Sequence, residues 1–246
     1  MTAILTAFRF LTILPLGKGR ETGPKDMAAA MAWFPLVGLC LGLGLDLVDH
    51  GMQRVLPQGV ADVFIIASLA FVTGGFHLDG FADTLDGLYG GRGDRERTLA
   101  IMKDSHVGAM GLIGLVLLML LKFETLENVA WTARAGALIV MPMAARWTQV
   151  LMAFGAEYAR KEGSLAQPFV QNLEMPQFLI ATVTAAIGTV VFAGPRALVI
   201  LAVCGAFALL AKYYFGRKIG GVTGDTIGGV SEAVEVMSLL GFLLAF

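Results

Sequence analysis

The chain of 246 residues is 57% hydrophobic, and its mean hydropathy of +0.74 exceeds that of a soluble domain, which must keep a wetted surface. Its 18 Lys and Arg and 19 Asp and Glu leave a formal net charge of -1, so no global basic field attracts nucleic acid. Composition therefore argues against a soluble domain and a nucleic-acid partner, and favours a protein embedded in a lipid bilayer.

The first apolar stretch, residues 4–16, is too short to cross a bilayer, because a spanning helix needs about 20 mostly apolar residues. It also contains Arg9, and it lacks both the basic n-region and the small-residue cleavage site of a signal peptide. We therefore predict that residues 1–16 form an amphipathic helix that lies in the membrane interface.

Seven later stretches are long and apolar enough, or nearly so, to span the membrane. They are residues 28–48, 60–77, 107–122, 129–153, 176–193, 197–215 and 226–246. The chain shows no internal repeat and no linker that would separate domains. We therefore predict an all-α, polytopic helix bundle with about seven transmembrane helices, built as a single membrane-embedded catalytic domain over residues 1–246.

Positive charge is concentrated in alternate connections. These connections hold Arg9, Lys18, Arg20, Lys25, Arg92, Arg95, Arg97, Lys103, Arg160, Lys161, Lys212, Arg217 and Lys218. The intervening connections hold only Arg54, Lys122 and Arg196. The positive-inside rule then places the N-terminus in the cytoplasm and makes residues 78–106 a cytoplasmic segment, which we expect to carry the active site.

Three aspartates, Asp79, Asp83 and Asp86, follow the second predicted span. On a helix at 100° per residue they point to about 0°, 40° and -20°, so all three carboxylates share one narrow face. Such crowded charges repel unless a divalent cation or protons neutralise them, and oxygen-only ligands favour Mg²⁺ or Mn²⁺ over zinc. The alternative is a solvated acidic helix face, although apolar residues surround the three aspartates.

A glycine-rich basic loop follows, from Gly90 to Arg97, and a short helix is expected over residues 98–103. Glycines allow a ligand to approach the backbone, and arginine matches the geometry of phosphate oxygens. Arg92 and Lys103 are therefore expected to hold phosphate. The alternative is that the basic loop only sets the membrane topology.

A second acidic face is expected on the last span. Glu232 and Glu235 point within about 80° of the direction of Asp225, and Glu235 lies roughly 13–15 Å below the start of that helix. Acidic side chains at this depth must face a polar interior, and they indicate a functional site by default. The alternative is a structural ion pair with Arg146 or Arg134. His77 and His106 are candidates for a general base, a phosphate donor or a partner of a metal-bound aspartate, or are structural histidines.

With these residues in place, the sequence resembles the cobalamin-5'-phosphate synthase family, also called adenosylcobinamide-GDP ribazoletransferases, over nearly its whole length. The blocks that carry the resemblance are residues 10–15, 34–38, 73–80 with Asp83, Asp86 and Gly87, 101–105, 158–160, and 224–226 with Glu232 and Glu235. One departure is His106, which stands where the family is expected to have an arginine.

The resemblance implies a Mg²⁺-dependent enzyme that joins adenosylcobinamide-GDP to α-ribazole or its 5'-phosphate and releases GMP, in cobalamin biosynthesis. The expected metal ligands are Asp79, Asp83, Asp86 and Asp104. The expected catalytic residues are Asp83, Glu232, Glu235 and His77, of which either glutamate is expected to act as base or second-metal ligand. The expected substrate-binding residues are Arg92, Lys103, Ser105, His106, Asp225 and Thr226.

The expected surroundings are a bacterial or archaeal plasma membrane, with the two small-molecule substrates and the bilayer as partners and homo-oligomerisation left open. Two other functions are considered. Residues 83–87 repeat the D-x-x-D-G opening of the CDP-alcohol phosphotransferases, but the last position of that motif is occupied by Gly108. An ion-coupled transporter that uses intramembrane acids is the other alternative.

Overall fold

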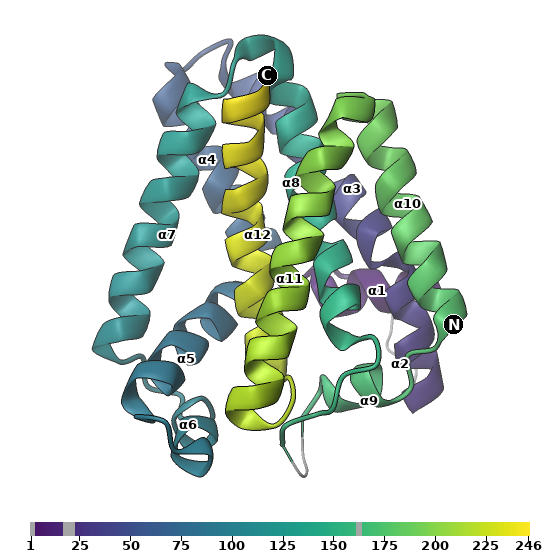
Figure 1. The fold of residues 1–246 in the computed structure, drawn as a ribbon. Helices are drawn as coiled ribbons and strands as arrows, with labels where there is room; N and C mark the ends of the chain where they lie inside the picture. The colour runs from purple at the N-terminus through teal and green to yellow at the C-terminus, as the bar shows by residue number, and fades with distance from the viewer. Residues whose placement is uncertain (1–2, 17–22, 161–163) are drawn as a thin grey trace.

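The computed structural model describes residues 3–16, 23–160 and 164–246, and within these ranges it is helical, without a β-strand (Figure 1). In chain order the elements are α1 Ala3–Leu11, α2 Pro24–Ala30, η1 Met31–Trp33, α3 Phe34–Met52, α4 Gln58–Val72, α5 Phe76–Gly90, α6 Arg95–Ile101, α7 Ala109–Asn128, α8 Trp131–Ala153, α9 Gln167–Gln171, α10 Met175–Ala193, η2 Pro195–Ala197, α11 Leu198–Ile219 and α12 Gly224–Ala245. Among the described residues, six helices are long and apolar enough to cross a membrane, or seven segments if the bent pair α4 and α5 forms one span. The predicted all-α membrane bundle is confirmed.

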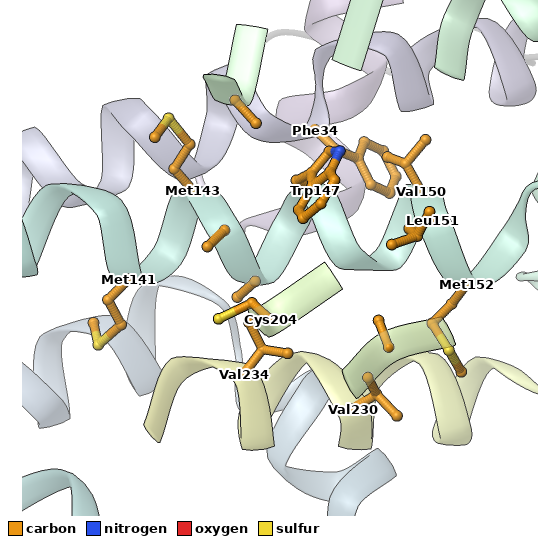
Figure 2. Close-up of a cluster of buried hydrophobic side chains, with 14 of the residues drawn as sticks. Phe34, Met141, Met143, Trp147, Val150, Leu151, Met152, Cys204, Val230 and Val234 are labelled. Carbon is orange, nitrogen blue, oxygen red and sulfur yellow. The ribbon is translucent and has the colours of Figure 1, made fainter. Parts of the chain in front are cut away.

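Helix α8 forms the centre of the bundle. In its most apolar stretch, 94% of the residues are buried inside the protein, compared with 28% for α7 and 22% for α10. Figure 2 shows side chains of α8, such as Met143 and Trp147, together with Phe34 of α3, Cys204 of α11 and Val234 of α12. Helices α3, α10, α11 and α12 pack against α8, whereas α7 packs against α4, α5 and α12 and presents most of its apolar surface to lipid.

Helices α3 and α8 pack closely because α3 has glycines at Gly38 and Gly42. A Cβ atom at Gly38 would lie 2.4 Å from the carbonyl oxygen of Pro142, and one at Gly42 would lie 2.5 Å from the Cα atom of Ile139. Small residues four apart allow two backbones to approach in this way, which is the usual basis of helix association in membranes.

The second predicted span, residues 60–77, does not continue straight to its expected end. Helix α4 stops at Val72, and α5 starts at Phe76 after a turn of 88°. Gly74 and Gly75 have φ angles of 64° and 68°, a left-handed conformation that glycine adopts without steric cost. The turn places α5, which carries the aspartates, across one end of the bundle.

Figure 1 shows α5, α6, α9 and the turn between α11 and α12 at one end of the bundle, with the C-terminus at the opposite end. The short N-terminal helix α1 buries Ala7 and Leu11, and Phe10 stacks on Phe34 of α3 and Phe169 of α9. A helix therefore forms in the predicted interfacial segment. Of the cations used to predict orientation, Lys18, Arg20 and Lys161 lie outside the described residues.

Candidate active site

The candidate site forms where α5 crosses α12. A Cβ atom at Gly80 would lie 3.0 Å from the Cα atom of Asp225, and one at Gly228 would lie 3.3 Å from the Cα atom of His77. Glycines on both helices therefore allow the two backbones to touch. This contact brings two predicted acidic segments together, although they are more than a hundred residues apart in the sequence.

Asp79, Asp83 and Asp225 make up the acidic cluster at this crossing. Asp83 is half-buried and lies within electrostatic range of both other carboxylates. Arg160, in the segment after α8, donates a hydrogen bond to Asp225 Oδ2 at 2.5 Å and another to the carbonyl oxygen of Met102 at 3.2 Å. One guanidinium thus neutralises only part of the charge of three carboxylates, and the cluster attracts a further cation.

The start of α12 is fixed by a reciprocal cap. The Thr223 hydroxyl accepts a hydrogen bond from the backbone N–H of Thr226, while the Thr226 hydroxyl accepts one from the N–H of Thr223. This capping box holds Asp225 in the first turn of the helix. Thr226, which was predicted to bind substrate, is fully buried and uses its hydroxyl in this cap.

Asp86, the third predicted member of the acidic face, contacts the start of α7. Its two carboxylate oxygens accept hydrogen bonds from the backbone N–H groups of Gly108 and Gly111, at 2.7 and 2.8 Å. A carboxylate at a helix N-terminus satisfies free N–H groups and interacts favourably with the helix dipole. Asp86 thereby joins α5 to α7, and its predicted role as a metal ligand stays a prediction.

Asp104 and His106 pair with each other in the exposed connection between α6 and α7. The Asp104 Oδ1 atom lies 2.6 Å from His106 Nδ1 and accepts a hydrogen bond from the His106 backbone N–H at 3.1 Å. The pairing lowers the pKa of the Asp104 carboxyl and raises the pKa of the His106 imidazole above its ordinary value. Among the interactions of the described residues, Asp104 makes none with Asp79 or Asp83. Its predicted role as a metal ligand stays a prediction.

A basic groove adjoins the acidic cluster. It has a volume of about 430 Å³ and is lined by residues of α6 and of the segments that follow α6 and α8. Its cations are Arg95, Lys103 and Arg160, and Arg160 belongs to both the groove and the contact with Asp225. Arg92 lies in the α5–α6 turn with φ of 50° and is exposed, as is Ser105.

Arg160 is the residue that the sequence-based site prediction missed. It lies in one of the blocks that resemble the family, but its position after a span favours a topological role equally well. Only the fold shows that the segment containing it turns back toward α12. The backbone N–H of Ala159 donates a hydrogen bond to the carbonyl oxygen of Val222 at 2.9 Å, and this contact holds Arg160 beside Asp225.

Glu232 and Glu235 lie away from the acidic cluster, in a buried ion network inside the bundle. Lys122 of α7 contacts Glu232 at 2.5 Å and Glu235 at 2.6 Å, and Arg146 of α8 contacts Glu235. Lys122, which was expected in a connection between spans, therefore lies within α7. Of the two arginines considered as structural partners, Arg146 is the one that pairs, whereas Arg134 binds Asp49 and Asp62.

His77 is buried on the side of α5 that faces the bundle. Its Nε2 atom lies 2.9 Å from the side-chain nitrogen of Gln149, which also donates a hydrogen bond to the Ser231 hydroxyl at 2.9 Å. The contacts of His77 are therefore those of a structural histidine that joins α5, α8 and α12. Its predicted catalytic role stays a prediction.

The acidic cluster has the donor chemistry that Mg²⁺ prefers. Mg²⁺ takes oxygen ligands, keeps several waters and needs only one or two carboxylates when phosphate oxygens complete its shell. Asp79, Asp83 and Asp225 offer carboxylates of this kind beside a groove suited to phosphate. Within residues 3–16, 23–160 and 164–246, however, no group of three or more His, Cys, Asp or Glu is arranged as a complete metal site. The residues therefore fit an ion that is bound partly by these carboxylates and partly by phosphate oxygens of the substrate.

Comparisons with known proteins show the family of the chain. The family model for cobalamin-5-phosphate synthase matches residues 3–243. The chain is 43% identical to the adenosylcobinamide-GDP ribazoletransferase of Geotalea daltonii, over 95% of this chain and 94% of that protein. It is 39% identical to the enzyme of the same name from Syntrophobacter fumaroxidans, over 95% of each. No solved structure matches the chain. The chain therefore belongs to the cobalamin-5-phosphate synthase family, whose members are transferases.

Proposed function

We propose that this chain joins adenosylcobinamide-GDP to α-ribazole, or to its 5'-phosphate, and releases GMP in cobalamin biosynthesis. The names of the relatives support the reaction. The observation that carries the proposal here is the close crossing of α5 and α12, which gathers Asp79, Asp83 and Asp225 beside the cations of the basic groove. A substrate pyrophosphate needs both features, because its oxygens carry negative charge and the leaving phosphate gains further negative charge as the bond breaks.

The reaction breaks a phosphoanhydride bond and forms a phosphate ester bond. A ribose hydroxyl oxygen of ribazole forms a bond to the phosphorus attached to cobinamide, and the bond from that phosphorus to the bridging oxygen breaks. GMP leaves with the bridging oxygen, and the hydroxyl proton passes to a base. Asp83 is the carboxylate we assign to this proton, since it is half-buried between two other carboxylates.

The cations of the groove bind and orient the phosphates in this proposal. Lys103 and Arg160 line the groove, and the guanidinium of Arg160 also fixes Asp225 at 2.5 Å. Arginine matches two phosphate oxygens at once, whereas lysine acts as a point charge. Asp79 and Asp225 would supply carboxylates to Mg²⁺, which when bound would neutralise phosphate charge on the substrate.

The test is turnover by purified protein in detergent or nanodiscs. Incubation with adenosylcobinamide-GDP, α-ribazole and Mg²⁺ is expected to yield GMP and a cobalamin in equal amounts, and chelation of Mg²⁺ is expected to stop both. Release of CMP from a CDP-alcohol without any GMP would support the phosphotransferase alternative instead. Flux of an ion across sealed vesicles without nucleotide turnover would support a transporter.

We also propose that the acidic end of the bundle faces the cytoplasm of a bacterial cell, with the N-terminus on the same side. Arg92, Arg95 and Lys103 lie at this end, as the positive-inside rule requires. A Ser105→Cys variant in a Cys40→Ala background is expected to react with a membrane-impermeant maleimide only in inside-out vesicles. Labelling in right-side-out spheroplasts would reverse the orientation.

A further inference from the structure

A second groove lies on the outer side of the bundle, where α11 passes the segment that follows α8. Its volume is about 420 Å³, and its lining includes Leu209, Lys212, Tyr213, Arg217 and Glu157. It is separate from the basic groove of the proposed active site, which is lined by residues of α6 and of the segments after α6 and α8. The proposed function assigns no role to this groove.

The groove follows two rows of residues along α11. Leu209, Tyr213 and Arg217 are four apart and form one row, and they change in order from aliphatic to aromatic to cationic toward the end of the helix. Leu209 and Tyr213 are 50% and 67% exposed. Side chains follow this order where a helix passes from the bilayer core to water, since tyrosine favours the headgroup level and cationic side chains extend into water.

The second row explains why a groove exists. Lys212 and Gly216 are also four apart, and Gly216 leaves the floor of the groove without a side chain. At Gly220, just past the end of α11, a Cβ atom would lie 2.9 Å from Cζ of Arg95, so that guanidinium bounds this end of the groove. A Cβ atom at Gly216 would have no heavy atom within 4 Å, so the space above it is open. A basic stretch that only set topology would not require such a recess.

The charges of the groove favour an anion. Lys212 is half-buried and donates a hydrogen bond to the carbonyl oxygen of Phe154, which holds its ammonium group at the groove wall. Arg217 is exposed, and the opposing carboxylate is that of Glu157, which leaves one net positive charge along the groove. The carbonyl end of α11 is itself capped, because the N–H of Gly220 bonds to the carbonyl oxygen of Phe215.

We propose that this groove binds the headgroup of an anionic phospholipid from the cytoplasmic leaflet. The phosphate lies against Lys212 and Arg217, and an acyl chain lies along Leu209. A free phosphate would contact the cations but not the side chains of Leu209 and Tyr213, so the sequence of residues from Leu209 to Arg217 favours an amphiphile.

A bound lipid would adjoin the proposed active site without entering it. The backbone carbonyl of Glu157 in the groove accepts a hydrogen bond from the N–H of Val222 at 2.8 Å, and Ala159 then returns a bond to Val222 at 2.9 Å. Arg160 follows directly. The groove wall is therefore part of the same short segment that holds Arg160 beside Asp225.

The experiment is native mass spectrometry of the protein released from nanodiscs that contain equal amounts of phosphatidylglycerol and phosphatidylcholine. The wild-type protein is expected to retain phosphatidylglycerol preferentially. Arg217→Gln is expected to reduce that retention about five-fold, which corresponds to about 1 kcal/mol for one interfacial cation. Lys212→Met is expected to have a similar effect.

The matched control is Arg196→Gln, which removes an exposed cation at the opposite end of α11. Retention is expected to stay at the wild-type level in this variant. Equal retention of the two lipids by the wild-type protein would overturn the proposal, and so would an equal loss in the Arg196 and Arg217 variants, because diffuse charge would then suffice. Inorganic phosphate that displaces the lipid at millimolar concentration would show a simple anion site and would overturn the choice of a lipid. None of these outcomes depends on turnover.

Discussion

Two groups of charged residues on α12 differ in their balance of charge. At the open end, Asp225 joins Asp79 and Asp83 with one arginine among them. Inside the bundle, Glu232 and Glu235 meet Lys122 and Arg146, so two carboxylates face two cations. The buried network is balanced in charge, whereas the open cluster lacks positive charge. The proposed active site therefore differs from the buried network in its incomplete neutralisation, since both groups contain acidic side chains.

The largest expected effect is on turnover at the open cluster. Asp83→Asn removes the group assigned to accept the hydroxyl proton, and GMP release is expected to fall by about 10³-fold, within the usual range for general base catalysis. The folded yield is expected to be unchanged. Asp26→Asn, which neutralises an exposed carboxylate on α2, serves as the control and is expected to keep full activity. Full activity in Asp83→Asn would remove this cluster from the reaction.

The next effect is on stability, at the buried network. Glu235→Gln leaves Lys122 and Arg146 with a single carboxylate in a buried setting, and it is expected to lower the free energy of unfolding by about 3 kcal/mol. Denaturation in mixed micelles, followed by tryptophan fluorescence, measures this change. The same acid-to-amide change at Asp79, where carboxylates repel one another, is expected to cost nothing. Equal losses in both variants would erase the contrast between the two regions.

A smaller effect is expected at Asp86, which lies on α5 but caps α7. Asp86→Ala removes two hydrogen bonds to N–H groups at the start of α7 and is expected to cost about 1 kcal/mol of stability. Turnover per folded molecule is expected to fall far less than in Asp83→Asn. If the two variants lose activity equally, Asp86 belongs with the acidic cluster as a ligand.

The smallest effect is a shift in titration at the exposed pair. Asp104 raises the pKa of His106, and His106 lowers the pKa of Asp104, so the pair is fully charged between these two values. The contribution of His106 is lost as pH rises through its raised pKa, and that of Asp104 is lost as pH falls through its lowered pKa. In Asp104→Asn the NMR titration midpoint of His106 is expected to move down toward the ordinary histidine value. An unchanged midpoint would show that the two side chains do not pair in solution.

The helical spans could be predicted from the sequence, because apolar length and local periodicity are encoded within single segments, whereas the position of the site stays a prediction. The spacing of Asp79 and Asp83 on one helix is confirmed. The sequence did not indicate which helix each acidic face would contact. Asp86 lies on nearly the same side as Asp79 by periodicity, yet it contacts α7 because that chain segment returns close to it.

Contacts between segments that are distant in the sequence account for the other differences between the predicted and the observed structure. Glu232 and Glu235 share a side of α12 as predicted, but their partners come from α7 and α8. The bend at Gly74 and Gly75 was visible only as a glycine pair, since the φ angles that turn the chain depend on what α5 packs against. Arg160 was missed for the same reason, because its contact with Asp225 spans 65 residues.

The ion pairs of Glu235 with Lys122 and Arg146 bear on the position of Asp225 at the start of the same helix. Glu235 follows Asp225 by ten residues, a rise of about 15 Å along a continuous helix. Because α12 is continuous, a change at Glu235 that shifts the helix along its axis would also shift Asp225 relative to Asp83, in spite of the local contacts with Arg160 and the cap. A substitution at a position remote from the substrate can therefore change the rate of the reaction by shifting α12 along its axis.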